Sequence, residues 1–165
     1  MEEEILILGV GNLLLSDEGV GIHVVRRLEE MSLPSNVEVI DGGTGGFELV
    51  RHLHNKTKVI IIDAVHGDTE PGAILRFAPH DLVLELRPTF SAHQTGIQGL
   101  LRFIQESPSP PDVVIFGIVP KETRRMSMSL SKPVQEKLSQ LVSAILKEIG
   151  LTAFPEGENA FSAHC

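Results

Sequence analysis

The sequence has 165 residues and a formal net charge of −8, with 42% hydrophobic and 22% charged residues. This composition is typical of a soluble globular protein, and the length predicts one domain spanning residues 1–165. The acidic balance, with no basic stripe, argues against a nucleic-acid partner. No apolar run approaches the ~20 residues of a membrane span, and acids stand where a secretory signal would carry basic residues. We therefore expect a cytoplasmic protein. Its single cysteine, Cys165, offers no internal disulfide and no obvious nucleophile.

The first element is a short apolar run, residues 5–8, which predicts a buried parallel strand. Gly9 and Gly11 follow it and allow a sharp turn. Ser16 is then a candidate N-cap, which would place two carboxylates in the first turn of a helix. The buried stripe of that helix is predicted to be Val20, Val24, Leu28 and Met31.

A Gly-x-Gly after a strand also fits a dinucleotide site. The third glycine of that pattern is replaced by Leu14. Asp17 and Glu18 occupy the helix end that would have to receive a pyrophosphate. Asp41, at the end of the next strand, stands where a ribose-binding acid would, so the nucleotide hypothesis stays open. A site lined by carboxylates suits a cation better.

The second strand, residues 37–40, leads into a glycine-rich loop. Four of the six residues 41–46 are glycine. The loop is either a simple connection in which Thr44 caps a helix running to His52 or Leu53, or a segment that moves over a ligand or grips a peptide.

The third strand, residues 59–62, is β-branched and apolar throughout, and we expect it in the centre of the sheet. Asp63 follows at the rim where α/β sheets bind ligands, although it could instead cap the next turn. Residues 73–77 come too soon after it for a helical crossover, which predicts an antiparallel edge strand.

The second half of the chain continues the alternation. Apolar residues at 97, 100, 101 and 104 predict a helix, with His93 on the loop just before it as a structural residue or a ligand. Residues 113–118 form the last predicted strand, and 121–131 an exposed loop. Ser131 is a candidate cap for the final helix, with Pro133 in its first turn and Gly150 at its end. Its predicted buried stripe is Val134, Leu138, Leu141, Val142, Ile145 and Ile149.

This order of elements predicts an α/β fold, a three-layer α/β/α sandwich on a mostly parallel sheet. The loops that follow the strands meet at one edge, so Glu18, Asp63 and His93 can converge there. Two carboxylates and an imidazole would leave open positions on a divalent ion, which suits catalysis better than a closed structural site. By spacing alone the three residues are a weak signal.

Six short motifs follow one another along the chain: Gly9-Val10-Gly11-Asn12, Asp17-Glu18-Gly19-Val20-Gly21, Asp41-Gly42-Gly43-Thr44, Asp63-Ala64, Ser91-x-His93-Gln94 and Gly117-Ile118-Val119-Pro120. In this order they make the sequence similar to the hydrogenase maturation endopeptidases, which trim the C-terminal extension from the large subunit of nickel-iron hydrogenases. The similarity extends to about residue 150.

The resemblance implies a twisted five-stranded sheet with one antiparallel strand. It further implies that Glu18, Asp63 and His93 bind a metal and act in catalysis through it. That metal would be nickel already inserted in the large-subunit precursor, and other divalent cations are expected to substitute. Asp41, Gly42, Gly43 and Thr44 would engage the substrate. Independently of the resemblance, we expect a monomer or weak oligomer.

Two other functions remain open from the sequence. One is a hydrolase with its own divalent metal, and the other is a non-enzymatic module that binds a nucleotide or a metal. The identity of a general base also stays open; Asp17 is a candidate, although stabilising the helix dipole suits it better.

Overall fold

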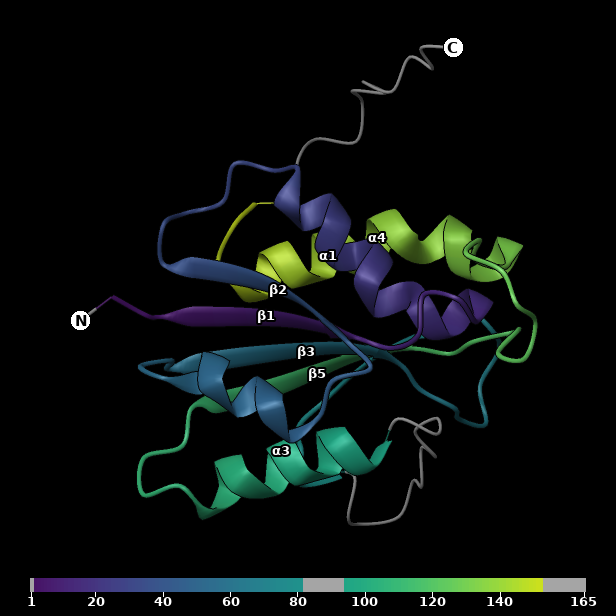
Figure 1. Ribbon diagram of the computed structural model, residues 1–165. Helices are drawn as coiled ribbons and strands as arrows, with labels where there is room; N and C mark the ends of the chain where they lie inside the picture. Colours follow the sequence, from purple (N-terminus) through teal and green to yellow (C-terminus); the bar gives the residue numbers. More distant parts are fainter. Residues whose placement is uncertain (1, 82–93, 153–165) are drawn as a thin grey trace.

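The computed structural model describes residues 2–81 and 94–152 (Figure 1). Its strands and helices, in chain order, are β1 (Ile5–Val10), the 3-10 helix η1 (Ser16–Gly19), α1 (Val20–Glu29), β2 (Val37–Gly43), the 3-10 helix η2 (Phe47–Leu53), β3 (Lys58–Ala64), β4 (Ile74–Phe77), α3 (Gln94–Glu106), β5 (Asp112–Ile118) and α4 (Lys132–Glu148).

The five strands form one mixed sheet in the order β2-β1-β3-β5-β4. Four of them run parallel, and β4 pairs antiparallel with β5 at one edge, with Ile74 opposite Ile118. The predictions of a central third strand and of an antiparallel edge strand are therefore confirmed. The opposite edge is β2, which in the described part of the chain pairs only with β1.

Helices cover both faces of the sheet, so the predicted three-layer sandwich is confirmed (Figure 1). Ile5 and Ile7 pack toward α1 and α4, whereas Leu6 and Leu8 pack toward η2 and α3. Successive side chains of a strand point to opposite faces, and both faces are covered here, which explains why β1 is apolar at every position. In the described ranges, no helix is long and apolar enough to span a membrane.

Two local predictions about helix starts were wrong, and a third was confirmed in position only. Ser16 has a φ of +49° and lies inside η1, and the α-helix begins only at Val20. Gly46, not Thr44, precedes η2, which is a 3-10 helix. Ser131 does stand at the N-cap of α4, but its side chain makes no capping bond. Its hydroxyl instead donates to Asp17, a partner that local sequence cannot reveal.

Candidate active site

Glu18 and Asp63 both lie at the carboxyl edge of the sheet, near enough for the charge of Glu18 to act on Asp63. Glu18 comes from η1 and Asp63 from the end of β3, and their exposed fractions are only 3% and 4%. The negative charge of Glu18 contributes to raising the pKa of Asp63, as two neighbouring acids require. The structure thus brings together two of the three residues that the sequence predicted to converge.

Close packing of glycines brings η1 down onto the strand ends. A Cβ on Gly21 would overlap the carbonyl oxygen of Ile62, and a Cβ on Gly9 would overlap the carbonyl oxygen of Gly21. The first turn of α1 therefore lies directly on β1 and β3. This contact holds Glu18, which precedes α1, against the end of β3.

Gly11 makes the turn between β1 and η1 with a φ of +138°, which favours glycine. Its N–H donates to the Gly43 carbonyl at 2.8 Å, and a Cβ at this position would overlap the Glu18 carbonyl oxygen. The same Cβ would stand 3.7 Å from Oδ1 of Asp63. Gly11 thus lies next to the Gly43 carbonyl, the backbone of Glu18 and the side chain of Asp63.

Burial is the main reason that the pKa of Asp63 is raised well above its ordinary value, and the Glu18 charge adds to the effect. The Ala64 N–H, which donates to Oδ1 of Asp63 at 2.7 Å, acts in the opposite direction. A buried acid whose ionised form is disfavoured is a candidate for a functional site.

Glu18 is only partly satisfied by its surroundings. Its Oε1 lies 3.6 Å from Nε2 of His66, and its Oε2 is buried without a hydrogen-bond partner among the described residues. A buried carboxylate oxygen that accepts no hydrogen bond lowers the stability of the fold. A cation bound by Glu18 and Asp63 would offset this cost, and carboxylate oxygens are suitable ligands for a divalent metal.

Asp17, the neighbouring acid, has a different environment. It is fully buried, and its carboxylate accepts hydrogen bonds from the backbone N–H groups of Lys121, Glu122 and Ser131 and from the Ser131 hydroxyl, at 2.7–2.9 Å. All four donors belong to the segment between β5 and α4. Asp17 therefore anchors that segment, which leaves it no free oxygen for the role of general base.

The third predicted metal ligand, His93, lies outside the described residues, directly before α3. Across residues 2–81 and 94–152, no three acidic, histidine or cysteine side chains are grouped so that they could hold a metal ion. The complete ligand set Glu18, Asp63 and His93 thus stays a prediction.

Sequence reasoning missed His66, which follows β3 by two residues. Its side chain is 41% exposed, and its Nε2 lies 3.6 Å from Oε1 of the buried Glu18. A signal was present, because a histidine three residues after a strand-end acid occupies the same rim of the sheet.

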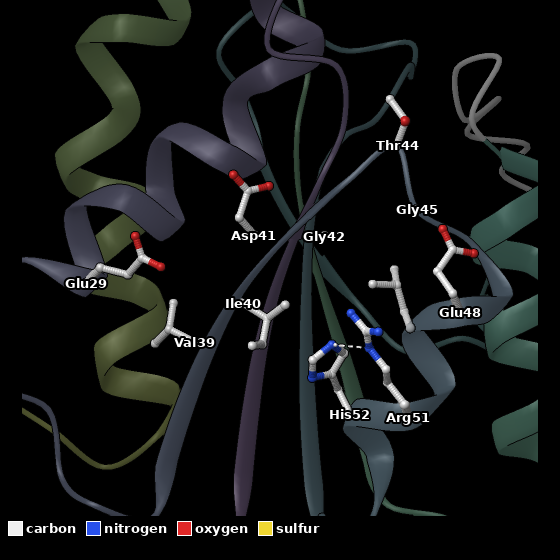
Figure 2. A pocket seen from close by; sticks show the side chains of 11 residues that line it. Glu29, Val39, Ile40, Asp41, Gly42, Thr44, Gly45, Glu48, Arg51 and His52 are labelled. Atoms are coloured by element: carbon white, nitrogen blue, oxygen red, sulfur yellow. Dashed lines mark hydrogen bonds between the residues drawn. The ribbon is translucent and has the colours of Figure 1, made fainter.

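Asp41, Gly42 and Thr44 line a hollow of about 530 Å³ beside the β2 edge (Figure 2). Arg51 and His52, from η2, lie toward its other end, where Nε of Arg51 donates to Nε2 of His52 at 3.2 Å. Neither Glu18 nor Asp63 lines this hollow. The hollow lies beside β2, and β1 separates β2 from β3, which carries Asp63. The hydrogen bond from the Gly11 N–H to the Gly43 carbonyl connects the two places.

A model of the hydrogenase maturation protease family matches residues 22–148. The chain belongs to this family. It is 33% identical over 159 residues to the hydrogenase 2 maturation protease of Escherichia coli, covering 92% of this chain and 95% of that protein.

Solved structures of maturation proteases share the fold. The hydrogenase maturating endopeptidase HybD from Escherichia coli aligns with a TM-score of 0.80 at 31% identity, covering 93% of this chain and 98% of that one. The [NiFe] hydrogenase maturation protease HybD from Thermococcus kodakarensis gives 0.73 at 30%, covering 88% and 99%. The predictions that the chain is an enzyme of this family and has its five-stranded mixed sheet are confirmed.

Proposed function

We propose that the protein is the endopeptidase that removes the C-terminal extension from the large-subunit precursor of a nickel-iron hydrogenase, after nickel has been inserted. Membership of the maturation protease family supports the class of reaction. The observation that carries the nickel-dependent part is the buried pair Glu18 and Asp63, in which one Glu18 oxygen has no hydrogen-bond partner within residues 2–81 and 94–152.

In this proposal the nickel is part of the substrate and is held by Glu18, Asp63 and His93. These three side chains would leave coordination positions open on the nickel, where the scissile carbonyl or a water molecule would be polarised. The protein has no complete site until the loaded precursor arrives. An unloaded precursor would therefore not be cut.

The loop Asp41–Thr44 would engage the peptide that leads to the cleavage point. Support comes from the hollow that it lines and from the outer edge of β2 beside it, with which no other described strand pairs. An extended segment can add to such an edge through main-chain hydrogen bonds, and Gly42 and Gly43 would let it approach the backbone closely. The Gly43–Gly11 bond links this edge to the acids.

A hydrolase with its own resident metal is the second candidate, because the same Glu18 oxygen, which has no partner in the part of the chain that the structure describes, would suit a metal taken from solution. The nucleotide hypothesis is weaker, since a buried carboxylate at the start of the helix would repel a phosphate.

The deciding experiment compares cleavage of nickel-loaded and nickel-free precursor by the purified protein. We expect cleavage of the loaded form only, and its loss in Glu18→Gln, Asp63→Asn and His93→Ala. The exposed Asp68→Asn serves as the control and should remain active. Equal cleavage of both precursors would refute nickel dependence. Activity that disappears with a chelator whatever the precursor's nickel content would favour the resident-metal hydrolase.

A further inference from the structure

Three exposed apolar side chains gather beside the candidate active site. Leu14, Met126 and Met128 are 52%, 75% and 54% exposed. The N–H of Ser127 donates to the Leu14 carbonyl at 2.9 Å, and Leu15 and Ser127 form a parallel bridge. Backbones paired in this way lie about 4.8 Å apart, so the side chains that flank the bridge belong to one surface. We call Leu14, Met126 and Met128 the methionine patch.

The methionine patch holds most of the exposed apolar bulk of the described chain. Across residues 2–81 and 94–152, five large apolar side chains are exposed, and three of them are in the patch. The other two, Phe47 and Phe103, pack edge to face on each other, with ring centres 5.7 Å apart. Single exposed apolar residues are common, whereas a group of them indicates a surface that binds another molecule. Methionine suits such a surface because its unbranched side chain adapts to a partner.

The backbone beneath the patch is held in place by hydrogen bonds from η1. The Ser16 N–H donates to the Ser127 carbonyl at 2.7 Å, and the Ser16 hydroxyl donates to the Ser129 carbonyl at 2.9 Å. Asp17 accepts four more hydrogen bonds from residues 121–131. Because this segment is already ordered, a partner that docks on it does not have to order it first, which favours binding.

Two arginines edge the patch. Arg124 and Arg125 are exposed and directly precede Met126. The carboxylate of Glu122 accepts their backbone N–H groups at 2.8 and 3.0 Å, and within the described ranges neither guanidinium takes part in an ion pair. The chain as a whole carries a net charge of −8. An apolar surface edged by two cations, on an otherwise acidic protein, complements a partner that presents apolar and acidic side chains.

The patch adjoins the segment that carries Glu18. The Glu18 N–H donates to the carbonyl of Leu15, the residue after Leu14, at 3.1 Å. In Figure 1 the segment between β5 and α4 runs beside the turn between β1 and α1. A protein substrate whose cleavage point lies at Glu18 would therefore also lie against the patch. A second copy of the chain docked at this place would instead cover the approach to Glu18.

We propose that the methionine patch, together with Arg124 and Arg125, is the surface on which the folded body of the large-subunit precursor docks, through apolar and acidic side chains of the precursor. This rests on the proposed function, because the partner is its substrate. The patch acts on affinity and not on the chemical step, so it binds nickel-free and nickel-loaded precursor alike. Docking on the patch then selects which protein is bound, and nickel selects which bound precursor is cut.

The test separates binding from cleavage. Calorimetric titration measures the affinity of the full-length protein for nickel-free precursor, and the cleavage assay gives KM and kcat for the nickel-loaded form. We expect Met126→Gln/Met128→Gln to weaken binding and raise KM at least about tenfold while kcat stays unchanged. Arg124→Gln/Arg125→Gln should weaken binding about tenfold at low salt and less at high salt, where the charges are screened.

Arg102→Gln/Phe103→Gln is the matched control. It removes an exposed arginine and the exposed apolar side chain next to it, but from α3. The affinity, KM and kcat should all stay unchanged in this variant. Thermal unfolding of Met126→Gln/Met128→Gln should give nearly the Tm of the unaltered protein, because both methionines are exposed.

Unchanged affinity in both patch variants would overturn the docking surface and leave the cleavage reaction as proposed. Weaker binding in a protein that cuts nickel-free and nickel-loaded precursor equally would support the docking surface and refute nickel dependence. Sedimentation tests the other occupant. A dimer of the unaltered protein that is lost in Met126→Gln/Met128→Gln, with no change in precursor affinity, would assign the patch to a second copy of the chain and overturn the proposal.

Discussion

Ser131 donates both its backbone N–H and its hydroxyl to the carboxylate of Asp17, each at 2.7 Å, across 114 residues of sequence. The bonds from Lys121 and Glu122 complete the set. Asp17 therefore joins the segment that carries Glu18 to the loop between β5 and α4. The position of the candidate site depends on a residue that takes no part in its chemistry.

We predict that Asp17→Asn destabilises the protein by about 3 kcal/mol or more, because an amide cannot accept all four donors and leaves buried N–H groups unsatisfied. Ser131→Ala removes only the hydroxyl and should cost about 1 kcal/mol. Urea denaturation measures both values. A stability of Asp17→Asn within 0.5 kcal/mol of the unaltered protein, about the spread of an ordinary surface substitution, would contradict the anchoring role.

Gly11→Ala should destabilise the fold by more than about 2 kcal/mol, since its φ of +138° is strained for alanine and its Cβ would overlap the Glu18 carbonyl oxygen. The control is Gly99→Ala in α3, where a Cβ would meet nothing within 4 Å. That substitution should stabilise by about 0.5–1 kcal/mol. Thermal unfolding distinguishes the two, and equal effects would contradict the close packing at Gly11.

Asp63→Asn should abolish processing and yet raise the stability of the metal-free protein at neutral pH. Because burial raises the pKa of Asp63, the folded state retains a proton that the unfolded state releases, and stability falls as pH rises above the ordinary aspartate pKa. Asparagine has no carboxyl group to ionise, so the stability of the variant does not fall with rising pH in this way. Its side-chain oxygen can still accept the hydrogen bond from the Ala64 N–H. We expect a gain of about 1 kcal/mol, or about 2–4 °C in Tm.

Thermal unfolding of Asp63→Asn between pH 4 and pH 8 in the presence of a chelator tests this expectation, with the exposed Asp68→Asn as the matched control. The control should have no effect on either stability or processing. A lower Tm for Asp63→Asn at neutral pH would show that the carboxylate is needed for the fold itself.

Glu148→Gln should reduce the free energy of unfolding by about 1–2 kcal/mol at pH 7, because Arg76 and Lys58 bind this carboxylate at 2.8–3.0 Å. The value is modest because Arg76 is exposed to solvent, which weakens its ion pair with Glu148. Its partners lower the pKa of Glu148 from 4.5 to about 2, the hydrogen bond from Arg76 most of all. The stabilisation is present above pH 4.5 and is lost as pH falls toward 2.

The difference in unfolding free energy between Glu148→Gln and the unaltered protein should therefore shrink over that acidic range. Glu136→Gln is the control, since Glu136 is exposed and lies 3.9 Å from Lys132. Its effect should stay small at every pH. A constant difference for Glu148→Gln down to pH 2 would mean that its charge is not what stabilises the fold.

Much of the fold followed from local patterns. Each strand was predicted within three residues of its observed ends, because a run such as residues 59–62 is apolar only when both faces of a strand are covered. The antiparallel edge strand followed from the short connection before it. Glu18 and Asp63 were predicted at one rim because the carboxyl ends of parallel strands meet there.

The sequence alone therefore determined the architecture and the placing of Glu18 and Asp63 at one rim of the sheet. Apolar periodicity and connection length, on which these predictions depend, are properties of short stretches of chain. Only the tertiary structure decided what the adjacent acids Asp17 and Glu18 do. Asp17 obtains all its donors from residues 121–131, whereas one oxygen of Glu18 obtains none among the described residues and the other faces His66. Hydrogen-bond partners supplied by distant segments leave no trace in local sequence, which is why two neighbouring carboxylates could be told apart only once the chain was folded.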